Sequence, residues 1–328
     1  MLIRYLIIAL SAFVFGWASN FLLKMFSQRY KLLASKGIPL VGGIGILLSL
    51  VPSCSISFYF LGQVPPEIRA IIISSLLIFF FGIIDDLREL SVALKLLAQV
   101  AATVLLIILG VHTRIAGIGV IANIAVTFFW VVGITNAFNL LDVMDGLAAG
   151  TAVIIAAAFF FVATITGNAP IAYFSSALIG AALGFLMYNF PPAKIYMGNS
   201  GSHFLGFIFA AVALAVSYAT AERKLALASP VLILGFPIFD MLFLILMRLR
   251  QKRSIFRKSR DHLVLRFLNA GYSKNKALIF MLMLCLFFTV SGVLTSQSTN
   301  LWGGAVIVIA LATGAMVARK MSGVKVEK

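Results

Sequence analysis

The sequence NAFNLLDVMDGL occupies residues 136–147 and lies between two long apolar segments. It places Asn136, Asn139, Asp142 and Asp145 at intervals of three residues in a chain of which only 11% is charged. Ionisable side chains near a bilayer are costly and are usually retained for a function. Neighbouring carboxylates also repel each other unless a cation or a proton lies between them. This stretch therefore indicates a membrane protein with a polar site at the ends of its helices.

The composition of the rest of the chain agrees with this interpretation. Hydrophobic residues make up 62% of the sequence, whereas a soluble globular protein is about one quarter charged. We therefore expect an all-α, polytopic integral membrane protein. Residues 2–24 have a longer apolar run than a signal peptide, which favours a retained first span over a cleaved leader. Cys54 and Cys285 are isolated in apolar runs and predict neither a disulfide framework nor a zinc site.

Eleven apolar segments are long enough to cross a bilayer, for which about 17–25 residues are needed. We expect them to form a single membrane domain over residues 1–328. The predicted spans are 2–24, 38–62, 68–84, 94–110, 116–135, 148–167, 169–190, 203–220, 227–248, 277–296 and 300–318.

The basic residues predict the orientation of these spans. Loops on the side of the C-terminus contain 21 of the 26 Lys and Arg residues, and the opposite side contains the other 5. The N-terminus is therefore expected outside and the C-terminus in the cytoplasm. Eight of the ten acidic residues fall near the same cytoplasmic face, which predicts the active site there. The net charge of +16 then indicates anionic lipids as partners, and no nucleic acid.

The acidic and carboxamide side chains suit a hard cation, which prefers oxygen ligands. One straight helix cannot aim all four polar residues of 136–145 at one point, so we expect a broken or tightened turn among them. A polar loop that uses Asn and Asp for turns is the alternative. Asp85 and Asp86 close the third span, either as part of the same site or as a solvated helix end beside Arg88.

Two further segments suggest phosphate chemistry. Gly198 and Ser200 precede the eighth span, where they form either a phosphate cradle at a helix N-terminus or a plain turn. Residues 248–262 are rich in Lys and Arg, which predicts contact with lipid head groups and also a clamp on a diphosphate. Asp240, inside the ninth span, either pairs with a basic residue or lines the site.

Together these blocks resemble the polyprenyl-phosphate N-acetylhexosamine-1-phosphate transferases of glycosyltransferase family 4, in the branch of the bacterial undecaprenyl-phosphate GlcNAc-1-phosphate transferases. The resemblance extends from about residue 36 to residue 276. The blocks that carry it are KGIPLVGG at 36–43, GIIDDL at 82–87, the long Asn and Asp block at 136–150, MGNSGSHFLGF at 197–207, PIFD at 237–240 and DH at 261–262.

The resemblance implies a reaction at the cytoplasmic face of the bacterial inner membrane. A UDP-amino sugar, with N-acetylglucosamine the expected sugar, would give its sugar 1-phosphate to undecaprenyl phosphate and release UMP. This is the first membrane step of a cell-surface glycan pathway, such as cell-wall or lipopolysaccharide synthesis. Mg²⁺ is the implied cofactor, with Mn²⁺ as an alternative, and a homodimer is an oligomeric state that the resemblance allows.

The resemblance also implies roles for particular residues. Asp85 or Asp86 would act as a base toward the lipid phosphate, or would bind metal or position a substrate. The expected catalytic residues are Asp85, Asp86, Asp142 and Asp145. The expected metal ligands are Asn139, Asp142 and Asn199. The expected substrate-binding residues are Lys36, Asn136, Asn139, Gly198, Ser200, Arg253, Arg260 and His262.

Three positions depart from the family pattern. Asn199 stands where the family usually has Asp, Leu265 stands where many members have a second His, and Val143 replaces a common Gly. Asn199 keeps one oxygen ligand but loses the charge, which leaves open an inactive relative that still binds polyprenyl phosphate. A secondary transporter is a further alternative, although transporters place ionisable residues at the bilayer midplane and contain inverted repeats.

Overall fold

The computed structural model describes residues 1–30, 33–35, 37–216, 218, 222–254 and 261–324. Within these residues the chain is almost entirely helical, which confirms the predicted fold class. The exception is a small hairpin of β1 (Ala34–Ser35) and β2 (Ile38–Pro39), in which Ala34 lies opposite Pro39. This hairpin falls where the second span was predicted to begin.

The chain forms two compact units, Met1–Ser217 and Tyr218–Lys328, and each is described by itself. The expectation of a single domain stays a prediction. The first unit contains α1 (Leu2–Tyr30), α2 (Gly42–Leu61), α3 (Pro66–Leu87), α4 (Val92–Ile108), α5 (Gly119–Leu141), α6 (Leu147–Ile165), α7 (Ala169–Asn189) and α8 (Gly198–Ala215). The second contains the 3-10 helix η1 (Lys224–Ala228), α9 (Ser229–Ile233), α10 (Gly235–Arg250), α11 (Leu263–Asn269), α12 (Lys274–Gln297) and α13 (Asn300–Ser322).

Nine helices in the described part of the chain are long and apolar enough to cross a membrane, or ten if one bent pair counts as a span. With the bent pair and the shorter apolar helix α4, these helices correspond to the eleven segments that the sequence predicts as spans. The segment predicted at 94–110 is α4, a shorter apolar helix whose 17 residues are at the lower end of the length needed to cross a bilayer. The segment predicted at 227–248 is the bent pair, in which Lys224–Ile233 and Gly235–Arg250 meet at 71°. The sidedness of the spans stays a prediction.

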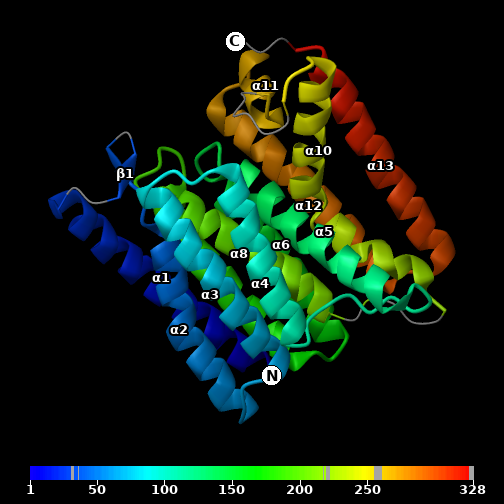
Figure 1. The fold of residues 1–328 in the computed structure, drawn as a ribbon, viewed down its shortest axis with the longest axis horizontal. Helices are drawn as coiled ribbons and strands as arrows, with labels where there is room; N and C mark the ends of the chain where they lie inside the picture. Colours follow the sequence, from blue (N-terminus) through cyan, green and yellow to red (C-terminus); the bar gives the residue numbers. More distant parts are fainter. Residues whose placement is uncertain (31–32, 36, 217, 219–221, 255–260, 325–328) are drawn as a thin grey trace. The chain divides into compact units, whose positions relative to one another are not determined.

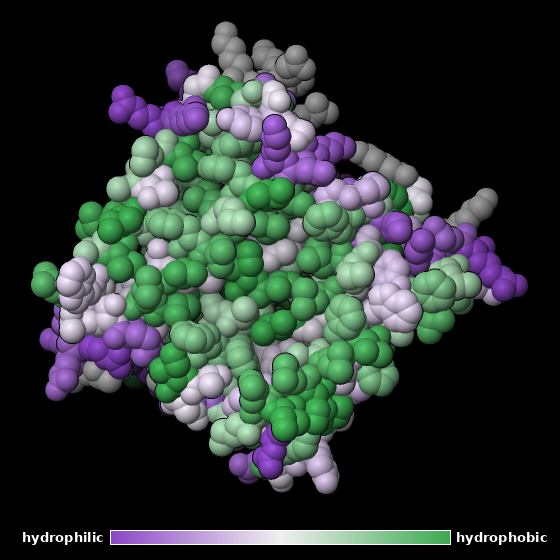
Figure 2. Space-filling model, turned by 180° about the vertical axis from the view of Figure 1, so that it is seen from behind, coloured by the Kyte–Doolittle hydropathy of each residue, from purple (hydrophilic) through white to green (hydrophobic). Residues whose placement is uncertain are grey.

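The helices differ greatly in how much of their surface the protein covers. Only 22% of the most apolar stretch of α1 is buried, and 17% of that of α13, whereas 83% of the corresponding stretch of α8 is buried. Apolar side chains cover much of the face seen in Figure 2. An apolar surface of this extent suits contact with lipid and not with water. The chain is therefore a multi-pass membrane protein.

Helix α8 is the most buried of the candidate spans in the first unit, and it packs against α3 and α5 (Figure 1). Glycines allow its first turn to approach two other helices. A Cβ atom on Gly82 of α3 would lie 2.5 Å from the Cα atom of Ser200. A Cβ atom on Gly43 of α2 would lie 2.4 Å from the backbone nitrogen of Gly201. The start of α8 is thus held directly against backbone, where no larger residue fits.

Backbone hydrogen bonds also join the end of the hairpin and the start of α2 to the residues that precede α8. The Gly42 and Gly43 N–H groups donate to the carbonyl oxygens of Tyr196 and Met197, each over 3.0 Å. The Tyr196 N–H in turn donates to the Pro39 carbonyl oxygen over 2.8 Å. The block at 36–43 and the block at 197–207, which are far apart in the sequence, therefore meet at the start of α8.

Candidate active site

Asp86 is bound to the N-terminus of α8. Its Oδ1 atom accepts a hydrogen bond from the Asn199 N–H over 2.7 Å, and its Oδ2 atom accepts one from the Ser200 N–H over 3.0 Å. The first N–H groups of a helix lack partners within the helix, and the helix dipole favours an anion beside them. Gly198 has a φ of +73°, and a Cβ atom there would lie 2.6 Å from Asp86 Oδ2. The N–H groups predicted to hold a phosphate are thus occupied by a carboxylate of the protein itself.

The end of α5 joins the same junction through carboxamides. Asn139 Nδ2 donates to Asn199 Oδ1 over 3.2 Å and to Ser202 Oγ over 2.8 Å. The Ser202 hydroxyl then donates to the Gly198 carbonyl oxygen over 3.0 Å. Two of the three predicted metal ligands, Asn139 and Asn199, are therefore in direct contact.

The turn expected after Asn139 is present. Helix α5 ends at Leu141 and α6 begins at Leu147, so Asp142 and Asp145 lie in the connecting turn. Gly146 has a φ of 78°, and its N–H donates to Asn189 Oδ1 over 3.0 Å. Asp145 Oδ2 accepts the Ala193 N–H over 3.0 Å. The helix is broken where the sequence required a break to aim these residues together.

Asp142 is the acid of this turn whose carboxylate makes no hydrogen bond or ion pair with the described residues. Loss of contact with water raises its pKa to about 7, and the charges of Asp86 and Asp145 add to this effect. Loss of water contact and the charges of Asp145 and Asp142 also raise the pKa of Tyr196. The phenol of Tyr196 therefore belongs to the same cluster, which sequence reasoning missed.

This donor set fits a hard cation. A cation beside Asp142 would offset the repulsion among the three carboxylates, and the carboxamides of Asn139 and Asn199 offer neutral oxygens nearby. No group of three or more His, Cys, Asp or Glu side chains with metal-binding geometry occurs among the described residues. A metal here would thus depend on one carboxylate and two carboxamides, a less charged set than three acids.

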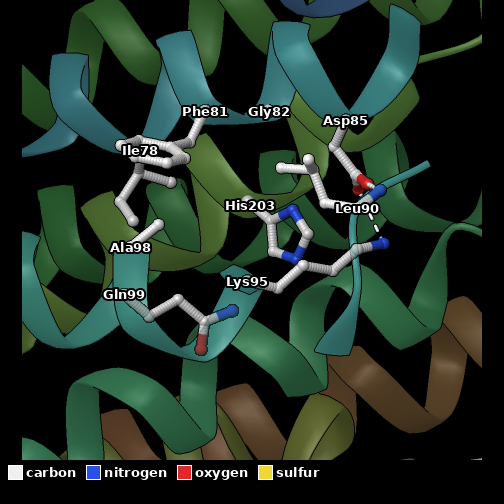
Figure 3. Close-up of a pocket in the computed structure, with 9 residues that line it drawn as sticks. All are labelled: Ile78, Phe81, Gly82, Asp85, Leu90, Lys95, Ala98, Gln99 and His203. Atoms are coloured by element: carbon white, nitrogen blue, oxygen red, sulfur yellow. Dashed lines mark hydrogen bonds and ion pairs between the residues drawn. The ribbon is translucent and has the colours of Figure 1, made fainter. Parts of the chain in front are cut away.

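Asp85 faces a different surface from Asp86. Its Oδ2 atom lies 2.7 Å from Lys95 Nζ of α4, and its Oδ1 atom accepts the Leu90 N–H over 2.7 Å (Figure 3). The carboxylate is buried, whereas the side chain of Lys95 is 25% exposed. Lys95, and not the adjacent Arg88, is thus its charged partner. The pair lies in a hollow of about 270 Å³, open mouth included, whose other walls include Phe81, Gln99 and His203.

Sequence reasoning did not identify Lys95 or His203 as site residues. His203 Nδ1 lies 3.1 Å from the Asn199 carbonyl oxygen, and since a carbonyl oxygen only accepts, Nδ1 is the donor. The ring lies beside Lys95 in Figure 3. A lysine inside an apolar helix such as α4 is the sequence signal that points to this hollow.

Asn136 is not bound to the Asn139 cluster. Its Nδ2 atom donates to Gln99 Oε1 over 2.7 Å, and Gln99 Nε2 donates back to Asn136 Oδ1 over 3.3 Å. The same Nδ2 atom also donates to the Val132 carbonyl oxygen over 2.8 Å. This reciprocal amide pair joins α4 to α5. Asn136 was predicted to contact substrate, but in the structure its side-chain amide is hydrogen-bonded to Gln99 and Val132.

The second unit contains the predicted residues Arg253, Arg260 and His262, whereas Lys36 belongs to the first unit. His262 Nδ1 lies 3.3 Å from Asp240 Oδ2, so Asp240 pairs with a histidine and not with a lysine or arginine. Arg253 Nη1 lies 3.7 Å from Asp261 Oδ2. The other oxygen of Asp261, Oδ1, lies 2.8 Å from Arg266 Nη2. The predicted substrate-binding residues Lys36 and Arg260 lie outside the described residues.

Comparison with known proteins identifies the family. Residues 68–217 match the sequence profile of glycosyl transferase family 4. The chain is 30% identical over 301 residues to a "Probable undecaprenyl-phosphate N-acetylglucosaminyl 1-phosphate transferase" of Bacillus subtilis, an alignment that covers 89% of this chain and 83% of the relative. It is 31% identical over 278 residues to a "Decaprenyl-phosphate N-acetylglucosaminephosphotransferase" of Mycobacterium tuberculosis, with 74% of this chain and 68% of the relative covered.

A third relative aligns over a shorter part of both chains. The "Phospho-N-acetylmuramoyl-pentapeptide-transferase" of Staphylococcus carnosus is 31% identical over 200 residues, which cover 54% of this chain and 62% of the relative. The region that matches the family profile, residues 68–217, contains the ends of α3 and α5 and the start of α8, where Asp86, Asn139 and Asn199 meet. The chain therefore belongs to the polyprenyl-phosphate N-acetylhexosamine-1-phosphate transferases of glycosyl transferase family 4.

Proposed function

We propose that this protein transfers an N-acetylhexosamine 1-phosphate, with GlcNAc the expected sugar, from a UDP-sugar to undecaprenyl phosphate. An oxygen of the lipid phosphate forms a bond to the sugar-linked phosphorus of the donor. The bond from that phosphorus to the bridging oxygen breaks, and UMP leaves while undecaprenyl-diphospho-sugar is formed. The names of the relatives, which describe such transfers, support this reaction.

The observation that carries the proposal is the junction at the start of α8. Three helix ends bring Asp86, Asn139 and Asn199 into contact there. Beside them lies the carboxylate of Asp142, which pairs with none of the described residues. Two phosphate-bearing substrates repel each other, so a site for them needs a cation and fixed hydrogen-bond donors. Acids and carboxamides gathered at one end of a membrane bundle suit this need, whereas a secondary transporter would need them at midplane.

The acceptor phosphate needs little help to lose its proton. The second pKa of a phosphate monoester is near 6, so the group is largely dianionic at neutral pH. Asp86 therefore acts by holding the start of α8, because both of its oxygens accept backbone N–H groups. Asp85 acts by holding Lys95, whose partly exposed ammonium offsets phosphate charge. In this proposal neither acid serves as an obligatory base.

Mg²⁺, or Mn²⁺ in its place, would be held by Asp142 together with Asn139 and Asn199. The ion supplies positive charge that stabilises the phosphates during transfer. Asp145 keeps the turn around Asp142 in place through the Ala193 N–H. His262 and Arg253 of the second unit bind the diphosphate, and the basic residues around them bind anionic lipid. The reaction takes place at the cytoplasmic face of the bacterial inner membrane, and a homodimer is one oligomeric state to test.

The test is a transfer assay with the purified protein. Radiolabelled UDP-amino sugars are offered with undecaprenyl phosphate, in the presence and absence of Mg²⁺ or Mn²⁺. We expect a metal-dependent lipid product, equimolar release of UMP, and at least a 100-fold loss in Asp142→Ala. Glu67→Gln is the control, because it removes an acid from the opposite end of α3, and it should retain turnover.

The same assay distinguishes a second candidate, an inactive relative that only binds polyprenyl phosphate. Asn199 favours this candidate because it gives the predicted metal site one charge less than an aspartate would. Absence of product with every donor, from folded protein, would overturn the enzyme. Turnover gained in Asn199→Asp would then assign the loss to this position, since Asp can accept the Asn139 hydrogen bond as Asn does.

A further inference from the structure

A buried carboxylate and a buried imidazole are paired in the second unit. Asp240 lies in α10 and His262 directly precedes α11, and only 3% and 5% of their surfaces are exposed. Asp240 Oδ2 lies 3.3 Å from His262 Nδ1, and Asp240 Oδ1 accepts the Leu263 N–H over 3.0 Å. Both oxygens of one side chain are thus directed at the same short segment.

The chemistry of the pair fixes which ring nitrogen carries a proton. A carboxylate only accepts hydrogen bonds, so His262 Nδ1 must be the donor. In the neutral ring this leaves a lone pair on Nε2, and in the charged ring it leaves an N–H there. In either state Nε2 is the ring atom left to meet a substrate. It makes no hydrogen bond with any residue in the described part of the chain.

A purely structural role would need only half of this arrangement. The N–H at the start of α11 requires one acceptor, which an asparagine at position 240 would also provide. Burying a full carboxylate in an apolar helix is costly and is usually retained for a function. Asp261 provides a contrast, because it precedes His262 in the chain yet pairs with Arg266 and accepts from Gln251 Nε2.

We infer that Asp240 is a positioning residue for His262: it accepts from Nδ1 and so directs the Nε2–H of the charged ring at a phosphate oxygen of the substrate. The inference rests on the proposed function, in which His262 binds the diphosphate. Asp240 touches no substrate itself. Its effect on turnover therefore passes entirely through the orientation of the imidazole and the proton on its Nδ1.

The first test reads the tautomer directly and needs no activity. The chain has three histidines, so selective ¹⁵N-histidine labelling gives a simple spectrum, and His262→Gln identifies the signal of interest. We expect wild-type His262 to carry its neutral-state proton on Nδ1. In Asp240→Asn the new amide donates to Nδ1, and the proton should move to Nε2. Asp261→Asn is the matched control and should leave the tautomer of His262 unchanged.

The second test is a double-mutant cycle on kcat and KM. We expect Asp240→Asn to lower kcat at least 10-fold, while the hydrogen bond to Leu263 is kept. The new amide donates to Nδ1, so the ring cannot hold a proton on both nitrogens and loses its positive charge toward the phosphate. The double variant with His262→Gln should be no slower than His262→Gln alone. A merely structural Asp240 would give losses that multiply, with no coupling between the two positions.

The two tests separate the possible failures. A wild-type His262 with its proton on Nε2, or a spectrum unchanged in Asp240→Asn, would overturn the inference whatever the activity. Multiplying losses of kcat would overturn it as well. A wild-type protein with the expected tautomer but without transfer of any sugar phosphate would count against the proposed function, while the pairing of Asp240 with His262 would stand.

Discussion

At the scale of single residues, the negative charge of Asp142 lowers the stability of the metal-free protein. Its carboxylate has no described partner and is surrounded by the charges of Asp86 and Asp145. Removing the charge should therefore help the metal-free fold. We expect Asp142→Asn in EDTA to raise the apparent Tm by about 2–4 °C, a gain of about 1 kcal/mol, as measured by differential scanning fluorimetry.

Mg²⁺ provides the control for this variant. A ligand that binds only the folded protein raises its stability, so Mg²⁺ should raise the Tm of the wild type and not that of Asp142→Asn. Equal stabilisation of both proteins by Mg²⁺ would place the ion elsewhere. A metal-free Tm that falls in the variant would show that Asp142 has a stabilising partner.

At the scale of elements, the contact of α3 with α8 depends on a missing side chain. A Cβ atom on Gly82 would meet backbone atoms of Ser200 at 2.5 and 2.8 Å, and backbone cannot move aside cheaply. We expect Gly82→Ala to lower the Tm by about 4 °C or more, since overpacking costs about 1–3 kcal/mol.

Gly133→Ala is the matched control within α5, because apart from the backbone of its own helix no atom of the described residues lies within 4 Å of its Cβ position. Alanine is favoured over glycine inside a helix by about 1 kcal/mol, so this variant should be neutral or slightly stabilised. Equal Tm values for Gly82→Ala and the wild type would show that α3 and α8 are less closely packed than described.

Helix α8 also depends on Asp86 for its beginning. Asp86→Ala leaves the N–H groups of Asn199 and Ser200 without their acceptor, a loss of about 1 kcal/mol for a helix cap. We expect faster hydrogen exchange over residues 199–202 by mass spectrometry, and unchanged exchange over residues 206–215. Asp86→Asn should show a smaller effect, because it keeps one acceptor oxygen. Unchanged exchange at 199–202 in Asp86→Ala would mean that other groups cap α8.

At the scale of the whole molecule, the distribution of charge predicts the orientation in the membrane. The sequence predicts 21 of the 26 basic residues on the side of the C-terminus, so a C-terminal green fluorescent protein fusion should fluoresce inside cells. The same site fused to alkaline phosphatase should be inactive. A pair of fusions at Arg114, on the side expected to be outside, should give the opposite result. An active phosphatase at the C-terminus would invert the topology and move the predicted site to the outer face.

Much of this architecture was readable in the sequence, because long apolar runs identify helices and acids at their ends are rare. The run that ends at Asp85 and the break between Asn139 and Gly146 are examples. What the sequence could not provide is which side chains meet across helices. Lys95 instead of Arg88 beside Asp85, and Asn199 beside Asn139 after 60 residues, depend on how helices rotate and slide against one another.

The reciprocal amide pair of Gln99 and Asn136 constrains how this protein can change over generations. Each carboxamide supplies both the donor and the acceptor that the other requires, in a setting where lipid offers neither. Replacing one member by an apolar residue leaves the other carboxamide without this hydrogen-bond partner, whereas replacing both at once leaves no carboxamide there. Positions 99 and 136 should therefore covary in descendants of this sequence. We expect the two residues of this α4–α5 contact to be substituted together, and neither position to be invariant.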